Sequence, residues 1–449
     1  TIGGVTKEGK NAVNELSYLF LEAELDVGLT VEEFIIRVNK NNPDTFLMKA
    51  CEVAKSLKGK LKFISDDTTI QQFLAKGMPV EYARDYIVAG CFTPTVPAFS
   101  FDTSAAMVNL PLILELALNN GVSRLTGEQI GPQTGDPEKF TSFDDVWNAF
   151  KTQVEAVVPK GMLLRNADRK VYADYAPCPF QSALFEGCIQ KGVDITNGGT
   201  APYITEGHGI VGLPNVGDSL AAIKKAVFED KKITMRRLIR ALDNNFEGDE
   251  EVLHLLKSMP KFGNDDDYVD GIVNDVVTLV ESEISKYRGI AGTKPVIAAA
   301  TGTGHLALGK VTGALPDGRK AGEPLSEGGI SPHQGRNISG LTATLKSVAK
   351  LDHLKIAGGS VLNVRLNPEV LKDNNKMKKF VSLVRTYCET GGYHVQFNIV
   401  DSGMLKDAQK NPDKYRDLLV RVATYSAYFV ELSTTLQNDI IARVEFQEV

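Results

Sequence analysis

The stretch RVATYSAYFVELS, residues 421–433, lies near the C-terminal end of the chain, before a polar tail with helical character. Two segments upstream, GGSVLNVRLNP (358–368) and YHVQFNIVD (393–401), are rich in residues that favour strands. Further upstream lie three segments with amphipathic helical patterns: VGDSLAAIKKAVFED (216–230), TMRRLIRALDNNF (234–246) and YVDGIVNDVVTLVESEISKY (268–287). They are followed by KPVIAAATG (294–302), which is typical of a buried strand. This alternation of helices and strands predicts an α/β fold, either a barrel or part of one.

The first sixty residues have the spacing of helices. In NAVNELSYLFLEAEL, the apolar residues Leu16, Leu19 and Phe20 would share one helix face. Residues 30–40, TVEEFIIRVNK, begin with a capping-box pattern and predict a second helix. Near the other end of the chain, we also expect a helix at 413–420.

The composition excludes several classes of protein. The chain has 449 residues, 43% of them hydrophobic and 24% charged, with a formal net charge of −6. Its basic residues are scattered, so we expect no nucleic-acid partner. The most apolar stretch, which follows Pro111, is too short to span a membrane. The five cysteines show no metal-ligand spacing, so we expect no metal site and a reducing, cytoplasmic location.

Familiar short motifs give little support to other enzyme classes. TGTGHLA (301–307) fits a dinucleotide-binding pattern, but the glycines and proline that follow should break the helix it needs. We therefore favour a glycine-rich loop there over a nicotinamide-dependent oxidoreductase. NDDDYVD (264–270) lacks the ligand spacing of a calcium loop and suits the start of a helix. Neither H-E-x-x-H nor G-x-S-x-G occurs, which argues against a zinc protease and a serine hydrolase.

Cys91 is the most informative cysteine, because it begins a proline-rich, largely apolar loop within AGCFTPTVP (89–97). A lone cysteine is most often a small structural residue. No basic neighbour in the sequence suggests an activated thiolate. A thiol can also react by hydrogen-atom transfer, which needs a sheltered pocket and no base, and this loop suits that chemistry.

The chain closely resembles the glycyl radical enzymes, the pyruvate formate-lyase-like family, over essentially its whole length. The segments that carry the resemblance are AGCFTPTVP, PKFGNDDDYVD, LGKVTGALPDGRKAGEPLSEGGISPHQGRN and LLVRVATYSAYFVELSTTLQNDIIARVEF. The resemblance implies part of a ten-stranded β/α barrel over residues 1–310 and a C-terminal glycyl radical domain over 311–449. Family members are much longer, so we expect an additional N-terminal half, as a missing segment or a second chain. It also implies a homodimer.

The resemblance further implies a radical mechanism. In the family, a radical-SAM activase removes hydrogen from a glycine, and the glycyl radical generates a thiyl radical on a cysteine that attacks a small-molecule substrate. No bound cofactor is expected. Cys91 matches the catalytic cysteine, and Thr424 stands where the motif R-V-x-G-aromatic has its radical glycine. The flanking Arg421, Val422 and Tyr425 match the motif.

Threonine at position 424 predicts that this chain is inactive as written. A Cα radical is stabilised by delocalisation into both peptide groups, which requires a planar centre. A stiff, β-branched side chain would crowd that centre and shield the hydrogen to be removed.

The reaction subclass follows less directly. Dehydratases of the family place a glutamate base where this chain has Thr93, and pyruvate formate-lyase has a second cysteine where it has Phe92. We therefore predict C–C bond chemistry on a small or apolar substrate, in the lineage of a glycyl radical lyase or an acyl- or alkyl-transferase, with Phe92, Thr93 and His333 in the substrate site. Hydrocarbon-activating members of the family add alkyl or benzyl groups to fumarate. No arginine that could bind the fumarate carboxylate occurs shortly after Cys91; the nearest downstream is Arg124. The alternatives are a dehydratase or lyase of the family and a non-catalytic scaffold or regulatory relative.

Overall fold

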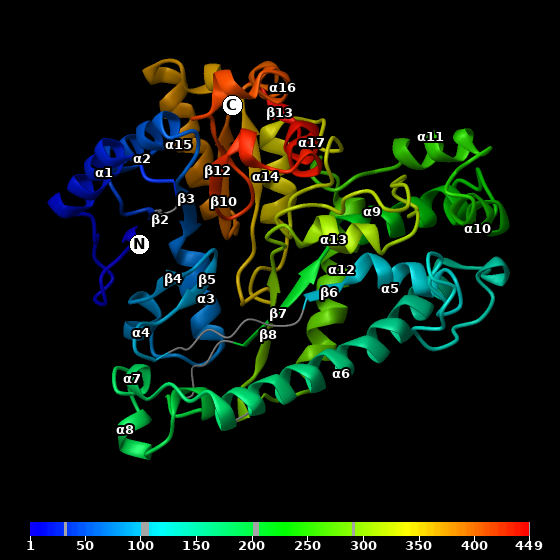
Figure 1. Cartoon of the computed structure of the whole chain (residues 1–449), viewed down its shortest axis with the longest axis horizontal. Coiled ribbons are helices and arrows are strands. Elements are labelled where there is room, and N and C mark those ends of the chain that lie inside the picture. The colour runs from blue at the N-terminus through cyan, green and yellow to red at the C-terminus, as the bar shows by residue number, and fades with distance from the viewer. Residues whose placement is uncertain (31–33, 100–106, 201–205, 290–291, 449) are drawn as a thin grey trace. The chain divides into compact units, whose positions relative to one another are not determined.

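The computed structural model (Figure 1) describes the whole chain except residues 31–33, 100–106, 201–205, 290–291 and 449. The described chain forms two compact units. The first unit contains Thr1–Pro97, Gly263–Asp265 and Gln334–Val449, and the second contains Ala98–Phe262 and Asp266–His333. The predicted boundary at residue 310, between a barrel part and a C-terminal glycyl radical domain, is a boundary between family domains and not between compact units. It stays a prediction.

The first unit is built on a six-stranded mixed sheet with the strand order β1-β2-β3-β10-β9-β13. Only the β3–β10 pair is antiparallel among these described neighbours. The strands are β1 (Ile2–Gly3), β2 (Ile35–Val38), β3 (Lys62–Ser65), β9 (Asn363–Leu366), β10 (His394–Ile399) and β13 (Glu445–Phe446). The helices of this unit are α1 (Glu15–Val27), α2 (Asp44–Ser56), α3 (Asp66–Ala75), α4 (Val80–Arg84), α14 (Leu341–Ala349), α15 (Asn374–Glu389), α16 (Ser402–Lys410) and α17 (Thr434–Ala442).

Strand β10 carries a different kind of side chain on each face. Successive residues of a strand point to opposite sides, and HVQFNI alternates polar and apolar residues. Phe397 packs against Phe380 of α15, with ring centroids 4.6 Å apart, and against Phe63 of β3. The polar residues Gln396 and Asn398 therefore lie on the opposite face, where both are buried.

Two short antiparallel hairpins complete the first unit. One joins β4 (Ile87–Ala89) to β5 (Thr93–Thr95) and carries Cys91 at its tip; we call it the cysteine hairpin. The other joins β11 (Leu419–Arg421) to β12 (Ser426–Tyr428) and carries Thr424 at its tip; we call it the 424 hairpin. Both residues singled out by the sequence thus lie in hairpin tips of the same unit.

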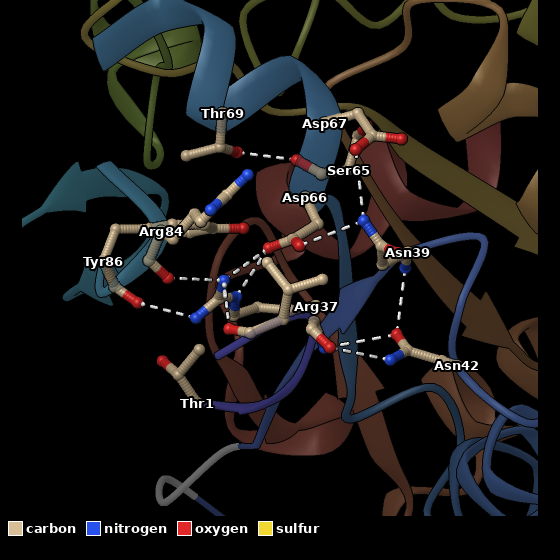
Figure 2. A network of polar contacts seen from close by, with 12 residues as sticks. Thr1, Arg37, Asn39, Asn42, Ser65, Asp66, Asp67, Thr69, Arg84 and Tyr86 are labelled. Carbon is tan, nitrogen blue, oxygen red and sulfur yellow. Dashed lines mark hydrogen bonds and ion pairs between the residues drawn. The ribbon is translucent and has the colours of Figure 1, made fainter. Parts of the chain in front are cut away.

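A buried ion pair fixes the chain that leads into the cysteine hairpin (Figure 2). Arg37 of β2 donates from Nε to Asp66 Oδ1 at 2.7 Å, and its Nη atoms donate to the carbonyls of Arg84 and Tyr86 at 2.8 and 3.2 Å. The guanidinium also lies 4.1 Å from the centroid of the Tyr86 ring. Burial raises the pKa of Asp66, and the charge of Arg37 opposes that shift. The ion pair therefore joins the sheet, α3 and the residues just before β4.

The second unit contains the parallel three-stranded sheet β6-β7-β8. Its strands are β6 (Met107–Asn109), β7 (Glu206–Val211) and β8 (Pro295–Ala299), so the buried strand predicted in KPVIAAATG is confirmed. The longer helices of this unit are α5 (Leu110–Ala117), α6 (Phe143–Tyr175), α9 (Leu213–Ile223), α10 (Met235–Asp243), α11 (Glu250–Ser258) and α12 (Asp267–Ile284). Within the part of the chain that the structure describes, no helix combines the length and apolarity needed to cross a bilayer.

The structure corrects four local predictions. Residues 35–38 form β2 and not a helix, because this largely β-branched run is buried between two neighbouring strands. Residues 31–33 of the predicted capping box lie outside the described residues. The predicted apolar face of α1 is exposed, with Leu16 61% and Leu19 57% accessible. Residues 413–420 contain a short 3-10 turn and the start of β11. TGTGHLA does lead into a helix, α13 (Gly304–Lys310), which ends after seven residues.

Candidate active site

Cys91 lies at the exposed tip of the cysteine hairpin, between Gly90 and Phe92. Gly90 has φ +55°, a left-handed conformation that glycine adopts without strain, and this lets three residues close the hairpin. The thiol is therefore presented on a tight turn. Strand β5 follows at once and contains Pro94, which is flanked by buried threonines and stiffens the strand because proline fixes φ.

The backbone beside Cys91 is held from two sides. The hydroxyl of Tyr393, which is fully buried, donates to the carbonyl oxygen of Phe92 at 2.5 Å. Burial raises the pKa of Tyr393, so the hydroxyl remains a donor at neutral pH. Gly359 lies against the same carbonyl: a Cβ at this position would be 2.4 Å from the Phe92 oxygen. These contacts fix the position of the tip while they leave the thiol accessible.

Thr93 is buried at the first position of β5, where a family dehydratase would have a carboxylate by the resemblance described above. Its side chain is a neutral hydroxyl, and its carbonyl accepts a long 3.5 Å bond from Thr95 Oγ1. A threonine hydroxyl is a poor proton acceptor at neutral pH compared with a carboxylate. This position therefore supplies no general base.

Thr424 lies at the tip of the 424 hairpin and is 5% exposed. The tip closes on itself through a bond from Val422 N to Tyr425 O at 3.0 Å. Thr424 does not occur among the described non-glycine residues that have positive φ. Its backbone therefore adopts angles that a β-branched residue tolerates, and the loop does not require glycine for its conformation. Threonine at this position is therefore unfavourable for a Cα radical and not for the fold.

Arg421 connects the 424 hairpin to the sheet. Its side chain is buried, and its Nη2 donates to Thr424 O at 3.0 Å and to Gln396 Oε1 at 2.8 Å. Its main chain exchanges two 3.3 Å bonds with the side chain of Asn398. The polar face of β10 thus binds the hairpin at Arg421, the last residue of β11. Arg421 places a positive charge next to the carbonyl of residue 424.

His394, also on the polar face of β10, is fully buried. Burial, together with the charges of Lys62 and Arg421, lowers the pKa of His394 well below its ordinary value. Its Nδ1 accepts a bond from the backbone N–H of Leu362 at 3.3 Å, which assigns the proton of the neutral ring to Nε2. This histidine is therefore neutral in the folded chain at pH 7.

His333, predicted to line the substrate site, belongs to the second unit. It is 8% exposed, and its Nδ1 lies 3.5 Å from Asp317 Oδ2. Asp317 also accepts a 2.7 Å bond from Asn215 Nδ2. Cys91, Phe92, Thr93 and Thr424 all lie in the first unit. The role of Phe92, Thr93 and His333 in binding substrate stays a prediction.

The residues that position the two tips were missed by the sequence analysis. Tyr393, Gly359 and Gln396 show no motif of their own, and each acts through a contact made across a long sequence separation. One signal was present: the polar residues of HVQFNI alternate in a strand that is buried on both faces. Polar groups on a buried face require partners, so this pattern could have pointed to a second element covering β10.

Two family models match this chain. The model described as pyruvate formate lyase-like matches residues 1–309, and the model described as glycine radical matches residues 326–430. The chain belongs to the glycyl radical enzyme family. The pyruvate formate lyase-like match includes the cysteine hairpin, and the glycine radical match includes the 424 hairpin.

Known glycyl radical enzymes agree with this assignment. The chain is 38% identical to trans-4-hydroxy-L-proline dehydratase of Clostridioides difficile and 37% identical to isethionate sulfite-lyase of Oleidesulfovibrio alaskensis, over 99% of its own length in both cases. It superposes on the B12-independent glycerol dehydratase of Clostridium butyricum with a TM-score of 0.96 and 40% identity. That match covers 99% of this chain and 56% of the dehydratase. The predicted α/β fold, part of a glycyl radical enzyme barrel with a C-terminal radical domain, is confirmed.

The chain spans about half the length of the relatives it matches, 56% of the hydroxyproline dehydratase and 54% of the sulfite-lyase. Similar glycyl radical enzymes include dehydratases, sulfite-lyases and a decarboxylase. Lyase chemistry is thus the common activity of the relatives, whereas the acyl- or alkyl-transferase lineage that the sequence also suggested has no counterpart among those named here.

Proposed function

We propose that this chain derives from a radical lyase in which Cys91 carries the thiyl radical, and that Thr424 prevents the radical from being installed. The observation that carries the proposal is the pair of tips: an accessible thiol on a fixed turn and a buried residue 424 on a hairpin that tolerates threonine. The match to the glycine radical family model supports the same assignment for residue 424.

The proposed chemistry consists of hydrogen-atom transfers. An activase of the radical-SAM type removes one hydrogen atom from the Cα of a glycine at position 424. That Cα takes the hydrogen atom of the Cys91 thiol, so an S–H bond breaks and a C–H bond forms. The thiyl radical then takes a hydrogen atom from a carbon of the substrate, and the S–H bond is restored. The chain supplies the thiol and its fixed position for both transfers.

The bond that the substrate radical would break is the finer part of the proposal. Relatives named as dehydratases and sulfite-lyases favour loss of water or sulfite, so C–O or C–S cleavage has the broader support. Thr93 cannot take the proton that such an elimination releases, which is why the sequence favoured C–C chemistry. One relative is an indoleacetate decarboxylase, so C–C cleavage also occurs in this family. We propose lyase chemistry on a small organic molecule, with any base contributed from outside the cysteine hairpin.

A non-catalytic scaffold is the second candidate. Threonine occupies both the radical position, at 424, and the position of the dehydratase base, at 93. A chain that kept the fold only for binding would be expected to lose both the radical glycine and the glutamate base. The homodimer and the additional N-terminal half remain predictions.

Electron paramagnetic resonance separates these candidates. The chain and its Thr424→Gly variant would be incubated without oxygen with a radical-SAM activase from a similar glycyl radical enzyme and S-adenosylmethionine. We expect no signal from the chain itself and a doublet from the variant, since the remaining α-hydrogen splits the signal. Incorporation of α-deuterated glycine should collapse the doublet and assign it to a glycyl radical, and the absence of the signal from the unaltered chain then places it at position 424.

Thr424→Ala is the matched control, because it removes the β-branch but keeps a Cβ. A radical signal in the unaltered chain would contradict the inhibitory role of Thr424. Silence in Thr424→Gly, with the activase shown to be active on its own partner, would overturn the radical proposal and favour the scaffold.

A further inference from the structure

The side chain of Arg421 makes hydrogen bonds beyond the backbone pairing of β11 with β12. Its Nη2 reaches the carbonyl of Thr424 at 3.0 Å, and its Nη1 reaches Ser426 Oγ at 3.2 Å and the carbonyl of Lys60 at 3.3 Å. The guanidinium also donates to Gln396 of β10 at 2.8 Å. It therefore contacts the hairpin, β10, and the chain at Lys60 just before β3. One side chain therefore ties the tip of the loop to the sheet below it.

The position of residue 424 explains why this contact matters for activation. Hydrogen-atom transfer requires the donor and acceptor atoms to come into near contact. Thr424 is 5% exposed, and its neighbours Val422 and Ala423 are 0% and 1% exposed. A separate enzyme cannot reach the Cα of residue 424 while the tip is packed this way. The tip must leave the sheet before the hydrogen is removed.

The guanidinium determines how costly that movement is. Its planar fork of five N–H donors fits several acceptors at once, which a lysine ammonium cannot reproduce. If the tip lifts away from the guanidinium, the bond to the Thr424 carbonyl breaks, and a buried positive charge loses part of its compensation. Arg421 therefore adds a specific polar resistance to opening, beside the burial of Val422 and Ala423.

We propose that Arg421 is the latch of the 424 hairpin, a positioning residue that keeps the tip closed and so sets how readily an activase reaches position 424. It does not touch the substrate. The proposal rests on the proposed function for its biological meaning, but the closing of the tip can be measured without any radical.

Hydrogen–deuterium exchange on the chain as it stands tests the latch directly. Arg421→Lys should accelerate exchange of the backbone amides in residues 422–428 by about tenfold, because it keeps the charge and loses the fork. The control is Arg365→Lys on β9. Arg365 is also buried and bonds the carbonyls of Ile440 and Arg443, so its replacement should loosen α17 and leave 422–428 unchanged.

A second measurement connects the latch to activation. In a Thr424→Gly background, Arg421→Lys should increase the initial rate of radical formation several-fold and shorten the lifetime of the radical, whereas Arg365→Lys should change neither. A purely structural role would reduce the yield of radical without raising the rate. If Arg421→Lys fails to fold, as judged by circular dichroism, Ser426→Ala removes one acceptor of the same guanidinium and should produce a smaller acceleration of exchange.

The outcomes are distinct. Unchanged exchange at 422–428 in folded Arg421→Lys and Ser426→Ala overturns the latch, whatever the radical measurements show. Faster exchange supports the latch, and if Thr424→Gly still yields no radical, it is the proposed function that fails. Faster exchange together with slower radical formation would overturn the role of the latch in activation.

Discussion

The cysteine hairpin and the 424 hairpin are both short, antiparallel and tight, yet they are held in opposite ways. The tip of the first is exposed at Cys91 and is fixed by neutral contacts to the Phe92 carbonyl. The tip of the second is buried at Thr424 and is fixed by the charged side chain of Arg421. The difference suits the two roles proposed for them: a thiol must meet a substrate, whereas a Cα radical must be protected.

The largest effect is expected where the cysteine hairpin approaches Gly359. Gly359→Ala should lower the free energy of unfolding by about 3 kcal/mol, because φ is +93° and the new Cβ would collide with the Phe92 carbonyl. Urea unfolding measures the loss. The matched control is Gly340→Ala, which has φ +100° but open space around it and should cost only the backbone strain, about 1–2 kcal/mol.

Equal costs at positions 359 and 340 would show that the Phe92 carbonyl does not lie against Gly359. In that case the cysteine hairpin would be held less firmly than its contacts indicate, and the contrast between the two hairpins would weaken.

Acid should weaken the first unit through its buried histidines. His394, beside the 424 hairpin, has a pKa lowered well below 6.5, and burial lowers the pKa of His353, which lies on the cysteine side beside Tyr393, to about 4. Below pH 6.5 the unfolded chain binds protons that the folded chain does not. The free energy of unfolding should therefore fall as the pH drops, by about 1.4 kcal/mol per pH unit for each histidine until its folded pKa is reached.

Urea unfolding between pH 7 and pH 5 measures this slope. His394→Asn keeps an acceptor for the Leu362 amide, removes the titration, and should make the slope shallower by about 1.4 kcal/mol per pH unit. His254→Asn, at an exposed position, is the control for the substitution itself. An unaltered slope in His394→Asn would mean that this ring is not held neutral by the fold.

The smallest effect is expected from a single hydroxyl. Tyr393→Phe removes the donor to the Phe92 carbonyl and should cost about 1 kcal/mol. It should also increase the alkylation rate of Cys91 several-fold, since the tip moves more freely. Tyr387→Phe is the matched control, because its hydroxyl donates at 3.0 Å to the carbonyl of His394, the residue after Tyr393. It should lose similar stability without changing the reactivity of Cys91; equal changes in both variants would contradict a specific clamp.

Local patterns predicted much of the fold. The strand in KPVIAAATG, the strands β9 and β10, and the helices α9, α10 and α12 follow from periodicity that a short window contains. The failure at residues 35–38 has a physical cause: IIRV suits a helix or a strand by its apolar content, and its pairing with β1 and β3 decided for the strand. The exposed side chains of Leu16 and Leu19 could not be foreseen, because periodicity shows that a face is apolar and not what covers it.

By itself, the sequence determined which residues can do the proposed chemistry: the thiol of Cys91, the missing base at Thr93 and the misplaced β-branch at Thr424 are properties of the residues themselves. Only the tertiary structure decided how these residues are held. Tyr393 reaches Phe92 across 301 residues, and Arg421 reaches Lys60 across 361. Hydrogen bonds of this range depend on how the sheet brings distant strands together, and no local pattern contains that information.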